Sequence, residues 1–283
     1  MSAAAGFQAP LVMGVLNTTP DSFSDGGQFN AVPEALAQAR LLVEQGAQII
    51  DVGGESTRPG ANRVAISEEI SRVVPVIEAI VITDWFKASG ARISVDTMNA
   101  ETAKAAIDAG AEIVNDVSGG LADKAMHKTV ASTDATYLLS HWRGFSDAMD
   151  SMNQYEDVAA DVVAELAEQV AIAVANGIPR ERIVVDPGLG FAKDLKQNWE
   201  LVARLDQLEK LGLPILVGAS RKRFLAGVLD ADPGSVDNNR RDLATAVLTA
   251  LLLQRKLWGL RVHNVQATVD AIKLVAALRG AQG

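Results

Sequence analysis

The stretch QIIDVGGESTRPGA, residues 48–61, joins a short aliphatic run to an abrupt polar end. Ile49, Ile50 and Val52 suit a buried strand. The residues that follow are two glycines, a carboxylate, two hydroxyls, an arginine and a proline, which offer little apolar surface. The pattern predicts a strand over residues 48–52, followed by a loop. Packing does not explain why this loop has so many polar groups.

Seven other segments have the same strand-like composition. They are Leu11–Leu16, Arg92–Val95, Glu112–Val114, Thr136–Leu139, Ile183–Val185, Pro214–Val217 and Leu260–Val262. Between them lie longer stretches with apolar residues three or four positions apart, which is the spacing of a helix with one buried face. One such stretch is marked by Val158, Val162, Leu166 and Val170.

Strands that alternate with helices, and that are apolar at nearly every position, are typical of a parallel sheet buried on both faces. We therefore expect an α/β fold, an eight-stranded parallel (βα)8 TIM barrel, with residues 1–283 as one domain. Such barrels have about 250 residues, close to this length. The alternative is a doubly wound open sheet. It would normally carry a glycine-rich phosphate loop after the first strand, and VMGVLNTTPDSF, residues 12–23, has none.

Composition excludes several classes of partner. The net charge is −9 and the pI about 4.9, so we expect no nucleic acid and no anionic membrane as partner. The longest apolar stretch, Ala244–Leu253, is too short to span a bilayer. It is expected to lie in the core or at a subunit contact. The chain has no cysteine and starts without an export signal, which favours the cytoplasm.

The predicted strands all end in polar groups, and in a barrel these ends meet at one rim, where the chemistry takes place. Taken singly, many such residues only cap the next helix, and we assign that role to Asp116, Ser118 and Ser140. We expect His127 on the surface of a helix and leave the role of His141 open. The polar strand ends run from Asn17–Asp21 through Asp96, Asn115, His141–Arg143, Asp186 and Ser220–Lys222 to Arg261 and His263.

These groups suggest two poles. Two carboxylates and an amide, from Asp96, Asn115 and Asp186, suit a ligand edge rich in N–H donors. The opposite pole suits a phosphate or pyrophosphate, with a divalent ion beside it held mainly by phosphate oxygens. Its members are Asn17, Arg58, Arg63, Arg221, Arg261 and His263, and Arg221, Lys222 and Arg223 form a basic cluster. The implied substrate has a donor-rich heterocycle at one end and a phosphorylated leaving group at the other.

Several motifs together resemble dihydropteroate synthase in order, spacing and position from Val12 to about Lys273. They are MGVLNTTPDSFSDGG, DVGGESTRPGA, SVDT, NDVSGG, DPGLGFAK, GASRKRF and RVHNV. The resemblance implies a TIM barrel, a homodimer and Mg²⁺. It implies an enzyme of folate synthesis, located in the cytoplasm and a target of sulfonamides. That enzyme joins 6-hydroxymethyl-7,8-dihydropterin pyrophosphate to p-aminobenzoate and releases 7,8-dihydropteroate and pyrophosphate.

The resemblance also implies a role for individual residues. Lys222, Asp21, Arg261 and His263 would be catalytic, with Asp21 as a proton acceptor. Pterin would be bound by Asp96, Asn115, Asp186 and Lys222. The p-aminobenzoate slot would be lined by Phe23, Thr57, Pro59, Phe191 and Ser220. Pyrophosphate would be held by Asn17, Arg58, Arg63, Arg261 and His263, with magnesium on Asn17. The loop that follows residues 48–52 would then close over the second substrate.

The sequence departs from the family pattern at some positions. Two other functions would also use a pterin-binding barrel. Asn264 stands where aspartate is common, which questions the orientation of His263, and Arg223 replaces a small hydroxyl residue. A non-catalytic pterin-binding paralogue would lose the aminobenzoate loops, yet STRPG and SRK are both present. A methyltetrahydrofolate-dependent methyltransferase domain would need no cationic pole. The expected route is dissociative, in which pyrophosphate leaves before the amine attacks, with no nucleophilic side chain.

Overall fold

Eight parallel strands form one sheet in the computed structural model, which describes residues 8–19, 31–55, 63–145 and 149–282. The strand order is β6-β5-β4-β3-β2-β1-β8-β7, so every strand up to β6 lies beside its neighbour in the chain. The bounds are β1 Leu11–Asn17, β2 Ile49–Gly53, β3 Arg92–Asp96, β4 Ile113–Asp116, β5 Thr136–Ser140, β6 Ile183–Asp186, β7 Leu216–Val217 and β8 Gly259–Val262. Each predicted strand is present, with small shifts at its ends.

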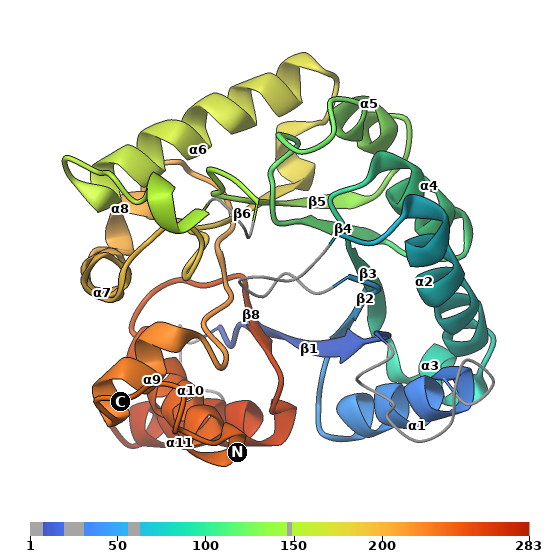
Figure 1. The fold of residues 1–283 in the computed structure, drawn as a ribbon. Coiled ribbons are helices and arrows are strands. Elements are labelled where there is room, and N and C mark those ends of the chain that lie inside the picture. Colours follow the sequence, from blue (N-terminus) through green and yellow to red (C-terminus); the bar gives the residue numbers. More distant parts are fainter. Residues whose placement is uncertain (1–7, 20–30, 56–62, 146–148, 283) are drawn as a thin grey trace.

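The two outer strands of this order meet and almost close the sheet into a barrel. Val185 of β6 and Ile215, just before β7, form an isolated parallel bridge, and Val185 N donates to Pro214 O over 2.9 Å. Figure 1 looks into this ring of strands, with the helices outside it. The prediction of a TIM barrel is confirmed. The open doubly wound sheet is excluded, since its two edge strands would lie far apart.

The helices follow the strands in chain order and cover the outside of the barrel (Figure 1). They are α1 Ala31–Glu44, α2 Ile66–Val81, α3 Asp84–Ser89, α4 Ala100–Asp108, α5 Met126–Ala131, α6 Val158–Ala175, α7 Leu195–Ala203, α8 Asp206–Glu209, α9 Arg223–Leu229, α10 Asn238–Leu252 and α11 Val265–Gln282. Short 3₁₀ turns span Met149–Met152 and Arg180–Arg182. Among the helices of the described residues, none is long and apolar enough to cross a bilayer.

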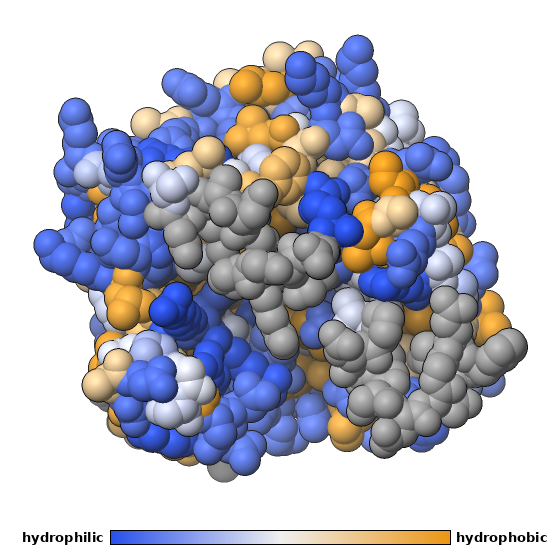
Figure 2. All heavy atoms as spheres, in the orientation of Figure 1, coloured by the Kyte–Doolittle hydropathy of each residue, from blue (hydrophilic) through white to orange (hydrophobic). Residues whose placement is uncertain are grey.

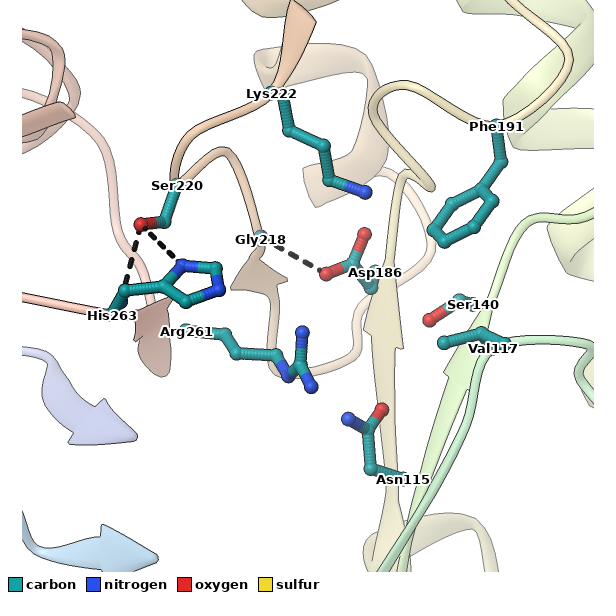
Figure 3. A pocket seen from close by; sticks show the side chains of 10 residues that line it. All are labelled: Asn115, Val117, Ser140, Asp186, Phe191, Gly218, Ser220, Lys222, Arg261 and His263. Carbon is teal, nitrogen blue, oxygen red and sulfur yellow. Dashed lines mark hydrogen bonds between the residues drawn. The ribbon is translucent and has the colours of Figure 1, made fainter. Parts of the chain in front are cut away.

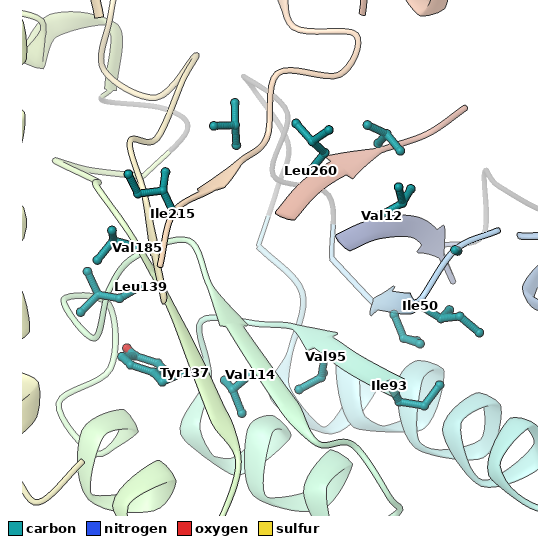
Figure 4. Close-up of a cluster of buried hydrophobic side chains, with 14 of the residues drawn as sticks. Val12, Ile50, Ile93, Val95, Val114, Tyr137, Leu139, Val185, Ile215 and Leu260 are labelled. Atoms are coloured by element: carbon teal, nitrogen blue, oxygen red, sulfur yellow. The ribbon is translucent and has the colours of Figure 1, made fainter. Parts of the chain in front are cut away.

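The alternation of side chains along the strands divides the core into two parts. Outward-facing residues pack against the helices in one large cluster that includes Val12, Ile50, Val95, Tyr137 and Leu260 (Figure 4). Inward-facing residues from six strands form a smaller apolar cluster inside the barrel: Met13, Ile49, Ile113, Leu138, Val184 and Leu216. Each of these lies early in its strand or segment. The polar residues that end the strands are therefore left for the opposite mouth.

Two expectations about helices have different outcomes. The stripe Val158, Val162, Leu166 and Val170 is buried in α6, as its spacing predicted. The surface position expected for His127 is wrong, because this residue of α5 is buried. Its Nε2 lies 3.0 Å from Gly119 O, and the ring has room because Gly120 has no side chain: a Cβ there would lie 2.1 Å from Nε2. On the face shown in Figure 2, most described side chains are hydrophilic, and hydrophobic ones lie in small groups among them.

Candidate active site at the carboxyl ends of the strands

Strand register places the predicted polar residues beside one another. Asp96 is the register partner of Gly53 on one side and of Asn115 on the other, and Ser140 pairs with Asp186. Because side chains alternate along a strand, these residues share the inward face. A pocket opens at this end of the barrel (Figure 3). It is lined by Asn115, Val117, Ser140, Asp186, Phe191, Gly218, Ser220, Lys222, Arg261 and His263.

Asp186 lies at the centre of the pocket and is held by backbone groups. Its Oδ1 accepts a hydrogen bond from Gly188 N at 2.6 Å, and its Oδ2 accepts one from Gly218 N at 3.1 Å. Burial raises the pKa of Asp186, while the Gly188 hydrogen bond and the charges of Lys222 and Arg261 act in the opposite direction. Both carboxylate oxygens are thus fixed in orientation, as a site for a ligand with paired N–H donors requires.

Arg261 lies deep among carboxylates and not at a separate cationic pole. Its Nε donates to Asp51 Oδ2 over 2.6 Å and its Nη2 to Asp96 Oδ2 over 2.5 Å. Asn115 Nδ2 also donates to Asp51 Oδ2, over 3.0 Å. Burial raises the pKa of Asp96 to about 7, and the nearby Arg261 charge opposes that shift. The prediction of an acidic pole separate from a basic pole is therefore wrong for Arg261, which contacts two carboxylates directly.

Lys222 and Phe191 face each other across the pocket. Lys222 Nζ lies 4.0 Å from the centre of the Phe191 ring, within cation–π distance. Burial lowers the pKa of Lys222 to about 8, and the Asp186 carboxylate opposes this shift. Gly190 has a φ of +79°, and a Cβ there would lie 2.9 Å from Lys222 Cδ. A larger residue at position 190 would displace the lysine.

His263 is oriented by Ser220. Ser220 Oγ accepts a hydrogen bond from His263 N at 3.1 Å and is hydrogen-bonded to His263 Nδ1 at 3.0 Å (Figure 3). Asn264, the departure from the family pattern, instead binds the start of α11, where its Oδ1 accepts from Ala267 N over 3.0 Å. The orientation of His263 in this structure therefore does not depend on a carboxylate at position 264.

The predicted cations Arg63, Arg221 and Arg223 do not line the pocket. Arg63 pairs with Glu55 at 2.8 Å and donates to Asn99 Oδ1 over 2.9 Å. Arg221 makes a two-pronged ion pair with Asp242 of α10, at 2.7 and 2.8 Å. Arg223 is exposed at the start of α9. The expectation that Arg221–Arg223 form one anion-binding cluster is wrong, because only Lys222 lines the pocket.

Some of the remaining predicted residues lie in the described part of the chain, and others lie outside it. Asn17 ends β1 beside Gly53, half-buried. Asp116 points away from the pocket and accepts hydrogen bonds from Ser118, Gly120 and Tyr137. Its role is structural, but the predicted helix cap is wrong, because α5 begins only at Met126. The capping role predicted for Ser140 is wrong too, since Ser140 lines the pocket. Five assigned residues lie outside the described part of the chain: Asp21, Phe23, Thr57, Arg58 and Pro59.

Sequence reasoning missed Asp51, which binds both Arg261 and Asn115. Asp51 lies inside β2 and is completely buried, so a search restricted to strand ends passed over it. The signal was present, because Ile49, Asp51 and Gly53 share one face of the strand. Lys193 in the DPGLGFAK motif was also missed. It is buried and bound to His141, which resolves the open role of that histidine as part of a hydrogen-bonded network.

Comparison with known families agrees with this geometry. The family model for pterin binding enzymes matches residues 13–263, which include every residue that lines the pocket. The barrel and its mouth thus define a pterin-binding enzyme, and the chain belongs to that family.

Individual relatives show which group of pterin-binding enzymes the chain resembles. The dihydropteroate synthase of Mycobacterium leprae is 47% identical over 268 residues, covering 94% of this chain and 92% of its own. The Xanthomonas albilineans dihydropteroate synthase solved with 4-aminobenzoic acid is 39% identical with a TM-score of 0.86, covering 96% and 94% of the two chains. The same enzyme in complex with 7,8-dihydropteroate is 36% identical with a TM-score of 0.83, covering 98% and 97%. Within its family, the chain belongs with the dihydropteroate synthases, which are transferases of folate biosynthesis.

Proposed function

We propose that the pocket joins 6-hydroxymethyl-7,8-dihydropterin pyrophosphate to p-aminobenzoate, giving 7,8-dihydropteroate and pyrophosphate. The observation that carries the proposal is the meeting of Asp186, Lys222 and Arg261 in one pocket, from three different strand ends. The X. albilineans relative, which shares the fold, binds 4-aminobenzoic acid and 7,8-dihydropteroate, one substrate and the product of this reaction.

The pterin end of the substrate belongs at Asp186 and Asn115. The pterin ring carries adjacent N–H donors, and a carboxylate accepts two parallel N–H bonds well. Asp186 is already oriented by two backbone amides, and Asn115 is oriented by Asp51. Asp96 would join them once Arg261 shares its donors with the ligand. Lys222 can donate to the ring from the other side of the pocket.

The second substrate belongs between Phe191 and Lys222. An aromatic amine needs an apolar wall on its ring and a polar group near its carboxylate, and Phe191, Lys222 and Ser220 supply these. The predicted contributions of Phe23, Thr57 and Pro59 remain part of this proposal.

Pyrophosphate belongs near Arg261 and His263, which are, with Lys222, the basic groups among the described residues that line the pocket. Arg261 binds two carboxylates through Nε and Nη2. A guanidinium carries five N–H donors, so others are left for phosphate oxygens. Arg63 and Arg58 would act from the loop that follows β2.

The residues present fit a magnesium ion that arrives with the pyrophosphate. In the described part of the chain, no three His, Cys, Asp or Glu side chains are grouped so that they could hold a metal. Mg²⁺ commonly keeps several waters and binds one or two protein oxygens plus substrate phosphates. Asn17, with its amide oxygen at the end of β1, would supply such a ligand. When bound, the ion would offset the charge of the phosphate oxygens.

The reaction proposed is dissociative. The bond between the pterin methylene carbon and the bridging oxygen breaks, and its electron pair leaves with pyrophosphate. Arg261 and His263 stabilise the growing negative charge. The methylene cation is delocalised into the electron-rich ring, beside the Asp186 carboxylate. The amine nitrogen of p-aminobenzoate then forms the new C–N bond and loses one proton, for which Asp21 is the proposed acceptor.

Positional isotope exchange tests this route. The pterin pyrophosphate carries ¹⁸O in the bridging position and is incubated with the enzyme without p-aminobenzoate. A dissociative route predicts that the label moves into non-bridging positions, because the released pyrophosphate rotates before it recombines. A label that stays in the bridge while complete mixtures form dihydropteroate would contradict the route but not the overall reaction.

We also propose that the chain acts as one domain and as a homodimer in the cytoplasm. The adjacent helices α10 and α11 expose large apolar side chains that suit a subunit contact: Leu243, Val247, Leu251, Leu274 and Leu278. The absence of cysteine fits a reducing compartment. Sedimentation of the purified protein tests the dimer, and Leu251→Glu with Leu274→Glu should shift it to monomer.

A further inference from the structure

Lys193 is a buried lysine behind the pocket whose three ammonium N–H donors all have acceptors. Its Nζ lies 2.9 Å from His141 Nδ1 and 3.0 Å from each of the carbonyl oxygens of Gly188 and Phe191. An ammonium has three donors and no acceptor. The geometry therefore matches a protonated lysine that holds both ends of the Gly188–Phe191 turn.

His141 connects this lysine to α6. The histidine side chain is completely buried. A protonated Lys193 donates to His141 Nδ1, and this assignment places the histidine proton on Nε2. Nε2 faces Glu165 Oε2 at 2.9 Å. Glu165 is fixed in turn by Arg143, which binds both of its carboxylate oxygens. Burial lowers the pKa of His141 to about 4, which is consistent with a neutral ring that has one donor and one acceptor.

The turn that Lys193 holds has an unusual backbone. Ala192 has a φ of 48°, in the left-handed region that residues with a Cβ rarely adopt. Gly188 has a φ of +66°, and a Cβ there would lie 2.0 Å from His141 O. Such conformations persist only where the surrounding structure holds them. The bonds from Lys193 to Gly188 O and Phe191 O provide that support.

The held turn places Phe191 in the pocket. Phe191 belongs to a small buried apolar cluster, and its ring faces Lys222 Nζ. The other members of the cluster are Met98, Val117, Trp142 and Ala192. Glu165, His141 and Lys193 are not among the described residues that line the pocket, and this turn is their structural connection to it.

We propose that Glu165, His141 and Lys193 form a positioning relay that fixes Phe191 against Lys222 and so sets the affinity for the second substrate. The inference rests on the proposed function, in which Phe191 lines the p-aminobenzoate subsite. The three residues are positioning residues, since none of them touches the substrates in this arrangement. The relay also contacts the pterin subsite, through Gly188, whose N–H donates to Asp186. Because that carboxylate keeps a second backbone donor in Gly218 N, we expect the relay to act more strongly on the second substrate than on the pterin.

Steady-state kinetics of two variants test the relay. Lys193→Met removes all three donors and keeps the apolar stem. Glu165→Leu removes the half-exposed outer end with less risk to the core. The matched controls are Lys196→Met, on exposed α7 surface, and Glu168→Leu, exposed on α6. We expect the KM for p-aminobenzoate to rise about tenfold in Lys193→Met and about threefold in Glu165→Leu, while the KM for the pterin pyrophosphate stays within about twofold.

The outcomes distinguish a failure of the relay proposal from a failure of the p-aminobenzoate subsite assignment. If Phe191→Ala raises the KM for p-aminobenzoate but both relay variants leave it unchanged, the relay is overturned and the subsite stands. If Phe191→Ala also leaves it unchanged, the subsite assignment is overturned and the relay with it. An equal rise in both KM values would indicate general loosening and would overturn the relay.

Histidine ¹⁵N NMR of the unmodified protein gives a second test that does not depend on variants folding. The relay requires His141 to be neutral at pH 7 with its proton on Nε2. Detection of the Nδ1–H tautomer or of a charged ring would overturn the proposed arrangement. His127→Gln identifies the signal of one of the other two histidines, and the signal of the ring bound to Ser220 should respond to pyrophosphate.

Discussion

Nη2 of Arg261 lies 2.5 Å from Oδ2 of Asp96, although 165 positions separate the two residues in the chain. The same guanidinium binds Asp51 through Nε. One arginine therefore holds together three strands, β2, β3 and β8, at the level where the substrate is expected. The buried carboxylates would destabilise one another without this cation, so the arrangement links the stability of the barrel to the chemistry of its mouth.

Asp51→Asn tests this link. The variant keeps the shape of the side chain but removes the charge that Arg261 faces in a completely buried site. Breaking a buried ion pair costs about 3–5 kcal/mol, and we expect the free energy of unfolding to fall by about 3 kcal/mol. The control is Asp206→Asn, whose half-exposed ion pair with Arg255 at 3.7 Å should contribute less than about 1 kcal/mol. Urea denaturation measures both. Equal losses in the two variants would contradict the role of Asp51.

Tyr137→Phe separates a structural carboxylate from a functional one. The Tyr137 hydroxyl donates to Asp116 Oδ2 over 2.8 Å, on the helix side of β4 and β5. Its removal should lower the free energy of unfolding by about 1–2 kcal/mol and leave kcat/KM unchanged. Tyr155→Phe is the control, because among the described residues its buried hydroxyl has no hydrogen-bond partner. A loss of activity in Tyr137→Phe would show that Asp116 takes part in the site.

The buried His141 predicts a specific pH dependence of stability. Its pKa is lowered to about 4 in the folded protein, from 6.5, chiefly by burial. The unfolded chain therefore binds the proton first, and stability falls as pH decreases from about 6.5 towards 4. Relative to His141→Gln, the wild type should lose about 2.5 kcal/mol between pH 7.5 and 4.5. The comparison with the variant is needed because of Asp96, whose pKa is raised to about 7 in the folded protein. Asp96 makes the folded protein more stable as pH falls over this range, which is opposite to the effect of His141. A difference that is constant with pH would contradict a buried neutral histidine.

Lys222 predicts the alkaline limb of the activity. Burial lowers its pKa to about 8, so the free enzyme loses this charge as pH rises through that value. We expect kcat/KM for the pterin pyrophosphate to fall with an apparent pKa near 8, because this ratio reports the free enzyme. In Lys222→Arg the side chain stays charged, so the limb should move above about pH 10 even if the overall rate is lower. A limb that stays in place would assign it to another group.

The fold could be predicted because its signal is local and repeated. Each strand is a short apolar run, and α6 shows its buried face in Val158, Val162 and Leu166. The start of β7 differs by two residues, since it was predicted at Pro214 but lies at Leu216. Pro214 lacks an N–H and contributes only its carbonyl, to Val185 N, where the barrel closes.

The site was harder to predict, because its details depend on contacts between distant strands. The residues at strand ends, such as Asp186 and Arg261, were found from position alone and do meet in one pocket. Whether an arginine pairs with a carboxylate depends on residues from distant parts of the chain. Arg221 pairs with Asp242 and Arg261 with Asp51, and no local pattern near either arginine indicates this. Burial of His127 depends likewise on a non-local detail, the absence of a side chain at Gly120.

The most direct test of the central claim is formation of dihydropteroate by the purified chain and by Asp186→Asn. Both are incubated with the pterin pyrophosphate, p-aminobenzoate and magnesium, and the product is measured by chromatography. We predict product from the wild type, and from Asp186→Asn a kcat/KM for the pterin pyrophosphate that is lower by about 100-fold, since a buried charged acceptor is lost. No product from the folded wild type, or equal rates from both proteins, would contradict the account.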